Sequence, residues 1–211
     1  MSVRAKICGL NTPETVAAAV EGGASYIGFN FYPPSPRAVT PEAAARLGAS
    51  IPTSVAKVAL VVDADDRLID AIAEALAPEI VQLHGAETPE RVAAIKTRTG
   101  RKVMKVVAIA TPADIEHTRA YESVADLLLF DAKPQPGGLP GGNGLSFDWR
   151  LLKDARWPLP WLLAGGLTPE NVAEAIRSTG AAQVDVSSGV EDRPGVKSPE
   201  KIRRFLRAAT S

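Results

Sequence analysis

Five short segments of the chain share one helix-start pattern, in which a hydroxyl residue is followed by proline and then glutamate. They are residues 12–14, 40–42, 88–90, 168–170 and 198–200. The hydroxyl caps the first turn, proline fits the first helical position, and the acidic side chain lies at the positive end of the helix dipole. Such repetition predicts a repeated unit built around a helix.

Short apolar, β-branched runs precede the helical segments. We expect strands at 5–8, 26–31, 57–62, 80–83, 102–109, 126–130, 161–164 and 183–186, and helices at 13–20, 41–47, 66–76, 89–99, 112–121, 148–155, 169–178 and 199–209. Regular alternation predicts parallel strands joined by helical crossovers. The sequence therefore predicts an α/β fold, a single-domain (β/α)₈ TIM barrel over residues 1–211. A doubly wound open sheet is the alternative, but no G-x-G-x-x-G follows the first strand.

Composition excludes several classes of partner. Lys and Arg together number 24, as do Asp and Glu, so the basic excess of a nucleic-acid-binding protein is absent. No apolar run approaches the roughly 20 residues of a membrane helix. Cys8 is the one cysteine, and the first residues lack the apolar core of a signal peptide. We expect a cytoplasmic protein with no disulfide.

Glycine and small polar residues follow the last two predicted strands. Gly165 and Gly166 end strand seven, and Ser187-Ser188-Gly189 ends strand eight. In a barrel these loops commonly bind phosphate, because backbone N–H groups can approach an anion where side chains are absent or small. Tight turns are the alternative. Because glycine and small polar residues occur at both of these expected strand ends, a phosphate site is favoured.

Cys8 and Asp131 are the candidate acid–base pair, since each stands at a predicted strand end. A lone cysteine is more often an inert core residue, and an aspartate there often caps a loop. Lys6 lies two residues before Cys8 on the same strand face. It could supply positive charge to a thiolate, bind substrate, or pair with a barrel carboxylate. Asp131 follows four apolar residues, and an apolar surround would raise the pKa of its carboxyl.

Arg37 lies in a proline-rich loop after strand two, where its planar fork suits a carboxylate or a phosphate. A solvated loop arginine is the alternative. We expect this loop to face the strand-seven and strand-eight loops across the barrel mouth. Residues 133–146 form the longest irregular stretch, either a lid or an insertion. His84 and His117 show no metal-ligand spacing, and His117 is expected at the surface.

Several segments resemble one family in order along nearly the whole chain: phosphoribosylanthranilate isomerase, of tryptophan biosynthesis. They are residues 6–9, 28–37, 81–85, 130–131, 141–144, 147–149, 163–167 and 184–191. No single segment is specific, but the ordered set is. The departures are Asn143, which stands where the family usually has a hydroxyl residue, and the stretch 133–140.

The resemblance implies an aldose–ketose type isomerase, an intramolecular oxidoreductase. It would carry out the Amadori rearrangement of N-(5-phosphoribosyl)anthranilate to 1-(2-carboxyphenylamino)-1-deoxyribulose 5-phosphate. Asp131 is implied as general acid, Cys8 as general base, and Arg37 as the ligand of the anthranilate carboxylate. The phosphate would lie at Gly165, Gly166, Ser187, Ser188 and Gly189, and we expect further substrate contacts from Lys6, Gln82, His84 and Asp185. No metal or cofactor is expected, because the substrate nitrogen is its own electron sink. A monomer or a homodimer fits equally.

Two related enzymes and one non-catalytic protein remain as alternatives. The histidine-pathway isomerase runs the same rearrangement but has an acidic residue at the end of strand one, where this chain has Cys8. Indole-glycerol-phosphate synthase is expected to carry a catalytic lysine and glutamate at strand ends and additional N-terminal sequence. A non-catalytic phosphate-binding barrel would keep the glycine loops and lose Cys8 or Asp131.

Overall fold

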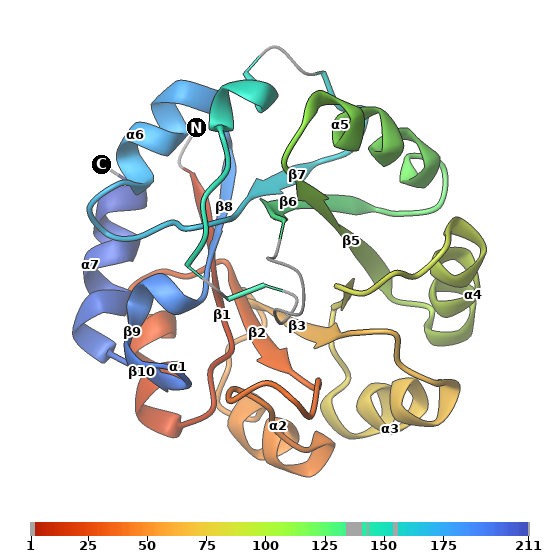
Figure 1. Ribbon diagram of the computed structural model, residues 1–211. Helices are drawn as coiled ribbons and strands as arrows, with labels where there is room; N and C mark the ends of the chain where they lie inside the picture. The colour runs from red at the N-terminus through yellow and green to blue at the C-terminus, as the bar shows by residue number, and fades with distance from the viewer. Residues whose placement is uncertain (1–2, 134–140, 143, 154–155, 211) are drawn as a thin grey trace.

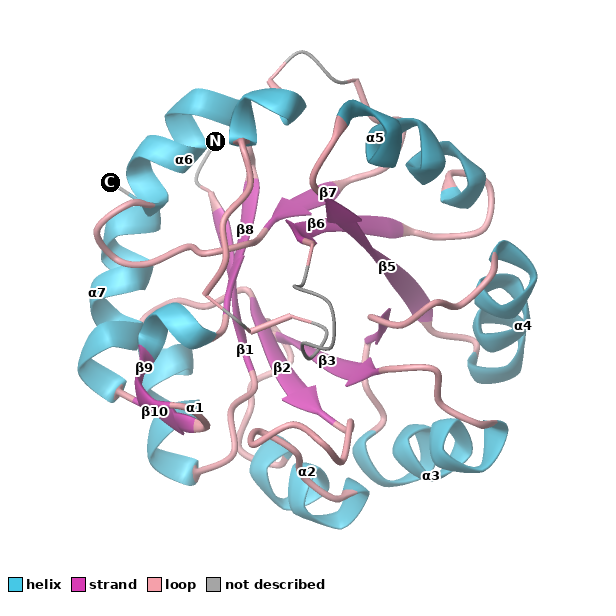
Figure 2. Ribbon diagram, viewed as in Figure 1, coloured by secondary structure: helices cyan, strands magenta, loops and turns pink. Residues whose placement is uncertain are grey.

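Eight parallel strands close into a barrel, with helices around its outer face (Figures 1 and 2). The computed structural model describes residues 3–133, 141–142, 144–153 and 156–210. The strands are β1 (Arg4–Cys8), β2 (Tyr26–Asn30), β3 (Ala56–Val61), β4 (Ile80–Leu83), β5 (Lys102–Ile109), β6 (Leu127–Ala132), β7 (Trp161–Leu163) and β8 (Gln183–Val186). Closure occurs where β1 pairs with β8, with Ile7 opposite Val186. The predicted barrel is confirmed.

The helices are α1 (Pro13–Glu21), α2 (Pro41–Gly48), α3 (Asp66–Leu76), α4 (Pro89–Thr99), α5 (Pro112–Thr118), α6 (Val172–Thr179) and α7 (Pro199–Thr210). Among the described segments, none of these helices is long and apolar enough to cross a membrane. A hairpin that the sequence did not predict, β9 (Glu191–Arg193) with β10 (Val196–Lys197), lies between β8 and α7.

The predicted caps hold at four of the five helix starts. The hydroxyls of Thr12, Thr40, Thr88 and Ser198 each accept a hydrogen bond from the backbone N–H three residues later. The prediction for Thr168 is wrong, because α6 begins at Val172. Asn171 explains the difference: its side chain accepts from the Thr168 N–H and donates to the Gly166 carbonyl, which holds residues 168–171 in a turn.

The helix expected at 148–155 is also absent from the described residues. A short 3₁₀ turn, η2 (Trp149–Leu152), takes its place, and residues 154–155 lie outside the described residues. The Asp148 side chain accepts from the Arg150 N–H two residues on, which favours a tight turn. Pro158 then biases Trp157 toward extended backbone, and Trp157 packs on Phe130 with ring centroids 4.6 Å apart.

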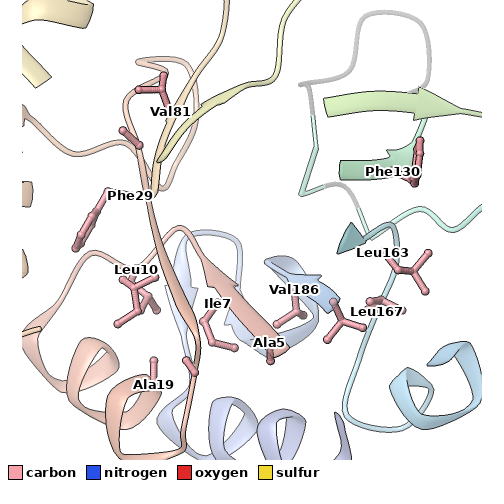
Figure 3. Packing of buried hydrophobic residues seen from close by; sticks show 14 of the residues in the cluster. Ala5, Ile7, Leu10, Ala19, Phe29, Val81, Phe130, Leu163, Leu167 and Val186 are labelled. Carbon is pink, nitrogen blue, oxygen red and sulfur yellow. The ribbon is translucent and has the colours of Figure 1, made fainter. Parts of the chain in front are cut away.

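Side-chain alternation along the strands divides the core in two. Inward-facing residues such as Tyr26, Val58 and Met104 fill the barrel below the mouth. Outward-facing residues, including Ile7, Phe29, Val81 and Phe130, pack between the sheet and the helices (Figure 3). Because side chains alternate with period two, the strand ends project their last inward residues into the mouth.

Asp114 joins the start of α5 to the residue that follows β6. Its carboxylate accepts from the backbone N–H groups of Ala110 and Thr111 and lies 3.1 Å from the Lys133 ammonium. Burial raises the pKa of Asp114, but the hydrogen bonds from Ala110, Thr111 and Lys133 outweigh it and lower that pKa from 3.8 to about 2. The ionised carboxylate therefore stabilises the fold.

We predict that Asp114→Asn lowers the free energy of unfolding by about 1–2 kcal/mol at pH 7. Because the folded-state pKa is depressed, this contribution is complete above pH 3.8 and is lost as the pH falls toward 2. Urea unfolding of both proteins across that range measures it. Glu116→Gln, which changes an exposed ion pair between α5 and Arg119, the residue that follows it, serves as the control and should change little. A difference for Asp114→Asn that persists at pH 2 would contradict the assignment.

Candidate active site

A pocket opens at the carboxyl ends of the strands, with an empty volume of about 740 Å³ that includes open solvent at its mouth. Its lining comes from six of the strands and from loops at their carboxyl ends: Cys8, Asn30, Tyr32, Ser35, Arg37, Leu60, Gln82, His84, Asp131, Ala132, Gly141, Gly142, Gly144, Leu145, Ala164, Gly165, Gly166, Leu167, Asp185, Val186, Ser187 and Ser188. Ten residues predicted as site residues are therefore brought together. Lys6 and Gly189, also predicted as substrate contacts, do not line it.

Lys6 lies beneath the pocket and is fully buried. Its ammonium is 2.9 Å from an Asp185 oxygen, so the pairing with a barrel carboxylate, one of the three roles considered for it, is present. Gly28, on the neighbouring strand, gives this group room: a Cβ there would lie 3.0 Å from the Cys8 sulfur and 3.2 Å from the Lys6 Cε. Lys6 therefore lies against Cys8 as well.

Cys8 is 4% exposed. Burial raises its pKa, and Asp185 adds to the rise, while the nearby Lys6 and Lys197 ammonium groups oppose it without cancelling it. Lys6, considered above as a source of positive charge for a thiolate, thus lowers the Cys8 pKa, but burial outweighs it. The thiol therefore holds its proton at neutral pH, and the two lysines limit the cost of removing it.

Asp131 is the penultimate residue of β6 rather than the residue after the strand. One carboxylate oxygen accepts from the Ala132 N–H at 2.8 Å, and the other lies 3.4 Å from His84 Nε2. The carboxylate thus has polar neighbours, contrary to the apolar surround expected. Gly141 covers the pair, since a Cβ there would lie 3.1 Å from Asp131 Oδ2.

Two side chains from the β4 end have unused hydrogen-bonding capacity. Gln82 is fully buried, and neither its amide nitrogen nor its oxygen has a hydrogen-bond partner among the described residues. His84 Nδ1 is likewise buried and unpartnered. Buried polar groups are usually hydrogen-bonded, so these atoms are available to a bound ligand.

A buried ion pair behind the β4 end supports these two side chains. The Glu87 carboxylate lies 2.7 Å from the Lys105 ammonium and accepts from the N–H groups of Asp63 and Gly85. Lys105 also donates to the Gly85 carbonyl, and the Tyr121 hydroxyl donates to the Glu87 carbonyl. The turn that follows His84 is therefore tied to β3, β5 and the segment after α5.

The glycines after β7 adopt conformations that other residues rarely take. Gly165 has φ 84° and Gly166 has φ 67°. A Cβ at Gly165 would lie 2.8 Å from the Ala132 backbone nitrogen, and one at Gly166 would lie 2.9 Å from the Ser146 Cβ. Gly189 packs closely on the Leu167 carbonyl. Turn geometry and close packing therefore require these glycines, and Gly165 and Gly166 also leave backbone exposed to the pocket.

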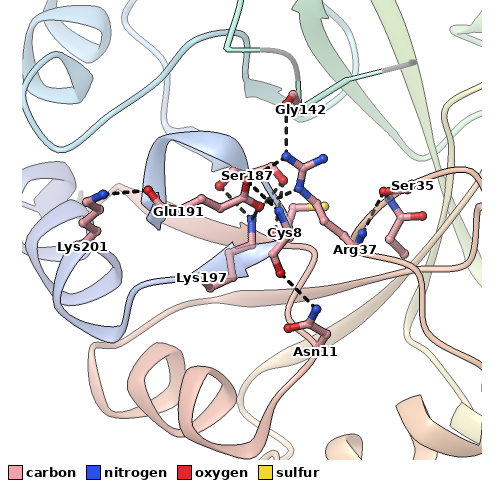
Figure 4. Close-up of polar contacts among 11 residues, drawn as sticks. Cys8, Asn11, Ser35, Arg37, Gly142, Ser187, Glu191, Lys197 and Lys201 are labelled. Atoms are coloured by element: carbon pink, nitrogen blue, oxygen red, sulfur yellow. Dashed lines mark hydrogen bonds and ion pairs between the residues drawn. The ribbon is translucent and has the colours of Figure 1, made fainter. Parts of the chain in front are cut away.

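Arg37 is held beside β8, which corrects the expected arrangement of the mouth (Figure 4). Its Nε and one terminal nitrogen lie 2.7 Å and 2.9 Å from the two oxygens of Glu191, and the same terminal nitrogen donates to the Gly142 carbonyl. The β2 and β8 loops are neighbours rather than opposed, because only β1 separates those strands in the closed barrel.

The described part of 141–146 passes over the mouth. Gly141 lies against His84, Gly142 against Arg37, and a Cβ at Gly144 would be 3.9 Å from the Ser188 hydroxyl. Residues 134–140 and 143, which include much of the expected lid and the departure at Asn143, lie outside the described residues. The exposed side chain of His117 lies on α5, away from this pocket, as predicted.

Sequence reasoning missed several residues of the site. Asn30 and Ser35 shape the loop that carries Arg37, since the Ser35 hydroxyl accepts from the Asn30 side chain and from the Arg37 N–H. Both lie in a segment quoted for the family resemblance, but nothing in the pattern distinguished them. Glu191 and Lys197 were missed because Arg37, the site residue to which they are coupled, is 154 positions from Glu191 in sequence.

The family model for N-(5'-phosphoribosyl)anthranilate (PRA) isomerase matches residues 5–208. N-(5'-phosphoribosyl)anthranilate isomerases of Parvibaculum lavamentivorans and Paracoccus denitrificans are each 57% identical to this chain. The first alignment covers 99% of both chains, and the second covers 100% of this chain and 99% of the relative.

Solved structures agree. The phosphoribosyl anthranilate isomerase of Thermotoga maritima superposes with a TM-score of 0.87 at 38% identity, over 98% of each chain. A phosphoribosyl anthranilate isomerase in complex with reduced 1-(o-carboxyphenylamino)-1-deoxyribulose 5-phosphate gives a TM-score of 0.85 at 36% identity, again over 98% of each chain. The chain thus belongs to the N-(5'-phosphoribosyl)anthranilate isomerase family and is an isomerase of tryptophan biosynthesis.

Proposed function

We propose that Asp131 and Cys8 are the general acid and general base of the Amadori rearrangement in this isomerase. The observation that carries the assignment is that both line one pocket, from β6 and β1, with an arginine and two glycine-containing loops at its rim. The histidine-pathway isomerase and a non-catalytic barrel are less well supported, because Cys8 takes the place of an acidic residue and both acid–base candidates are present.

Asp131 acts first. Its proton is transferred to the furanose ring oxygen, the ring C–O bond breaks, and a protonated imine forms between C1′ and the anthranilate nitrogen. The polar environment of Asp131 suits this role, since His84 Nε2 at 3.4 Å and the Ala132 N–H stabilise the carboxylate that remains. No metal is required for ring opening when an acid protonates the leaving oxygen.

Cys8 acts second. The protonated imine withdraws electrons from C2′, and the thiolate removes the C2′ proton to give an enolamine, which tautomerises to the ketone. Burial raises the pKa of the thiol, so the base is strong once ionised. The positive charge of the imine then adds to that of Lys6 and Lys197 and favours the thiolate when it is needed.

The phosphate and carboxylate ends of the substrate bind at neighbouring regions of the pocket rim. Its phosphate lies at Gly165, Gly166, Ser187 and Ser188, where backbone N–H groups are accessible. Its carboxylate lies at Arg37, whose guanidinium lines the pocket. The unpartnered groups of Gln82 and His84 bind sugar hydroxyls between the two ends. Gly189 supports the phosphate loop from below, and Lys6 supports Cys8.

The partner is therefore a small phosphorylated molecule. A thiol base must stay reduced, which suits a cytoplasmic location. Both a monomer and a homodimer suit the barrel, and a solved relative from Thermotoga maritima is described as monomers generated from a dimeric enzyme.

Substitution of Cys8 tests its role as the general base. Cys8→Ala should reduce kcat by ~10²–10⁴ with the fold retained, because a general base is lost. Cys8→Ser should also be slow, since a hydroxyl is a much weaker base at neutral pH. Circular dichroism controls for folding. Unchanged turnover in Cys8→Ala would remove Cys8 from the mechanism.

The same residue gives a pH prediction. Thiolate absorbance near 240 nm, recorded as the wild-type minus Cys8→Ala difference, should titrate with a midpoint above the ordinary thiol value, because burial raises the Cys8 pKa. A midpoint below that value would contradict the buried environment described here. Since Cys8 is the one cysteine of the chain, the difference spectrum has a single source.

Asp131→Asn preserves shape and removes the transferable proton. We expect kcat to fall far more than KM rises, because protonation of the ring oxygen is required in the transition state. Steady-state kinetics, with binding of a non-reacting product analogue as the control, measures both effects. A variant that changes only KM would identify Asp131 as a binding residue.

Arg37→Ala should weaken ligands that carry the aromatic carboxylate by ~1.5–3 kcal/mol, the usual worth of a charged hydrogen bond. It should scarcely affect ribose 5-phosphate. Gly166→Val should do the reverse, because its backbone conformation and packing admit no side chain. Inhibition constants of anthranilate and ribose 5-phosphate against both variants give a two-by-two test. Equal losses for both ligands in Arg37→Ala would show that the two ends are wrongly assigned.

A further inference from the structure

Arg37, Glu191 and Lys197 form a buried charge cluster below the pocket rim (Figure 4). One oxygen of Glu191 lies 2.7 Å from Arg37 Nε and 2.9 Å from the Lys197 ammonium, and the other accepts from Arg37 at 2.9 Å. The side chains of Lys197 and Glu191 are 0% and 5% exposed. The carboxylate is therefore shared between two cations.

The charges of this cluster do not balance internally. Two cations face one carboxylate, so the cluster is positive by one charge when no ligand is present. Arg37 lines the pocket, whereas Lys197 and Glu191 do not. Without Lys197, the bidentate Arg37–Glu191 pair would be neutral and would offer an incoming carboxylate little net attraction. With Lys197 present, Glu191 is drawn toward a second cation.

We propose that Lys197 is a positioning residue that determines specificity for an aromatic carboxylate: by sharing Glu191, it leaves Arg37 with a positive charge that the carboxylate of the substrate neutralises. The proposal rests on the assignment of Arg37 made above and extends it to two residues that never touch the ligand. Substrate binding then completes a cluster of two cations and two carboxylates.

The burial of Lys197 is consistent with such a role. Burial lowers its pKa, the Glu191 carboxylate opposes that effect, and the result is a pKa of about 8 rather than 10.5. The other charged or titratable neighbours are Arg37 and Cys8. A buried ammonium costs stability unless it is fully paired. A second carboxylate, supplied by the ligand, relieves that cost in the complex.

Lys197 could also have a purely structural role, which must be distinguished from its effect on the charge of Arg37. Its ammonium donates to the carbonyl and the hydroxyl of Ser187, at the phosphate end. Loss of Lys197 could then displace Ser187 and weaken every phosphorylated ligand. The two roles differ in one respect: a charge effect is reversed when the Glu191 charge is removed as well, and a displaced loop is not.

The test uses two non-reacting ligands at pH 7. One is reduced 1-(o-carboxyphenylamino)-1-deoxyribulose 5-phosphate, and the other is the same compound with phenyl in place of carboxyphenyl. The Kd of the phenyl compound divided by the Kd of the carboxyphenyl compound, both measured by calorimetry, isolates the contribution of the carboxylate to binding. The variants are Lys197→Met, Glu191→Gln with Lys197→Met, and Arg37→Ala. Lys201→Met is the matched control, since Lys201 contacts the Glu191 carbonyl but is partly exposed.

We expect Lys197→Met to reduce the wild-type ratio by roughly tenfold, the double variant to restore it to within about threefold, and Lys201→Met to leave it unchanged. A ratio that is unchanged in Lys197→Met, or reduced and not restored in the double variant, overturns the proposal. Arg37→Ala reports separately on the proposed function. If it leaves the ratio unchanged, the carboxylate does not bind at Arg37, whatever the lysine variants do.

Discussion

The pairing of β1 with β8 is the contact on which the site depends. It joins the two ends of the chain, and it places Lys6 beside Asp185 although 179 residues separate them in sequence. Every residue proposed to act on the substrate projects from a strand end or loop that this closure holds at one mouth. An open sheet of the same strands would leave Cys8 at one edge and the Ser187–Ser188 loop at the other.

Closure also decides where charge is buried. The barrel interior below the mouth is largely apolar, so Lys6 is withdrawn from water, and Asp185 and Cys8 beside it compensate its charge. Burial lowers the pKa of Lys6, but Asp185 and Cys8 more than reverse the change, and the ammonium is retained. A permanent cation beneath the thiol stabilises the Cys8 thiolate more strongly here than it would at the surface, because little solvent screens the interaction.

The barrel and the inward-facing positions of several site residues could be predicted from the sequence. Period-two alternation along strands of four to eight residues places Cys8, Gln82 and Asp131 on the inner face, whatever the distant contacts are. Local sequence patterns gave a wrong helix start where a nearby side chain competed with the expected cap, as Asn171 does before α6. They also failed at the Arg37–Glu191–Lys197 cluster, because an ion pair between residues 154 positions apart leaves no periodic trace in the sequence.

The placement of the buried ion pairs has a consequence for folding. Lys6–Asp185, Arg37–Glu191 and Glu87–Lys105 each join a residue from the first four strands or their loops to one from the last four. A half-barrel folded alone would leave three charged side chains without their native partners at its two seams. Such an intermediate is costly, because a buried charge that loses its partner destabilises strongly. The two halves should therefore gain and lose structure together, as one cooperative unit rather than as two modules.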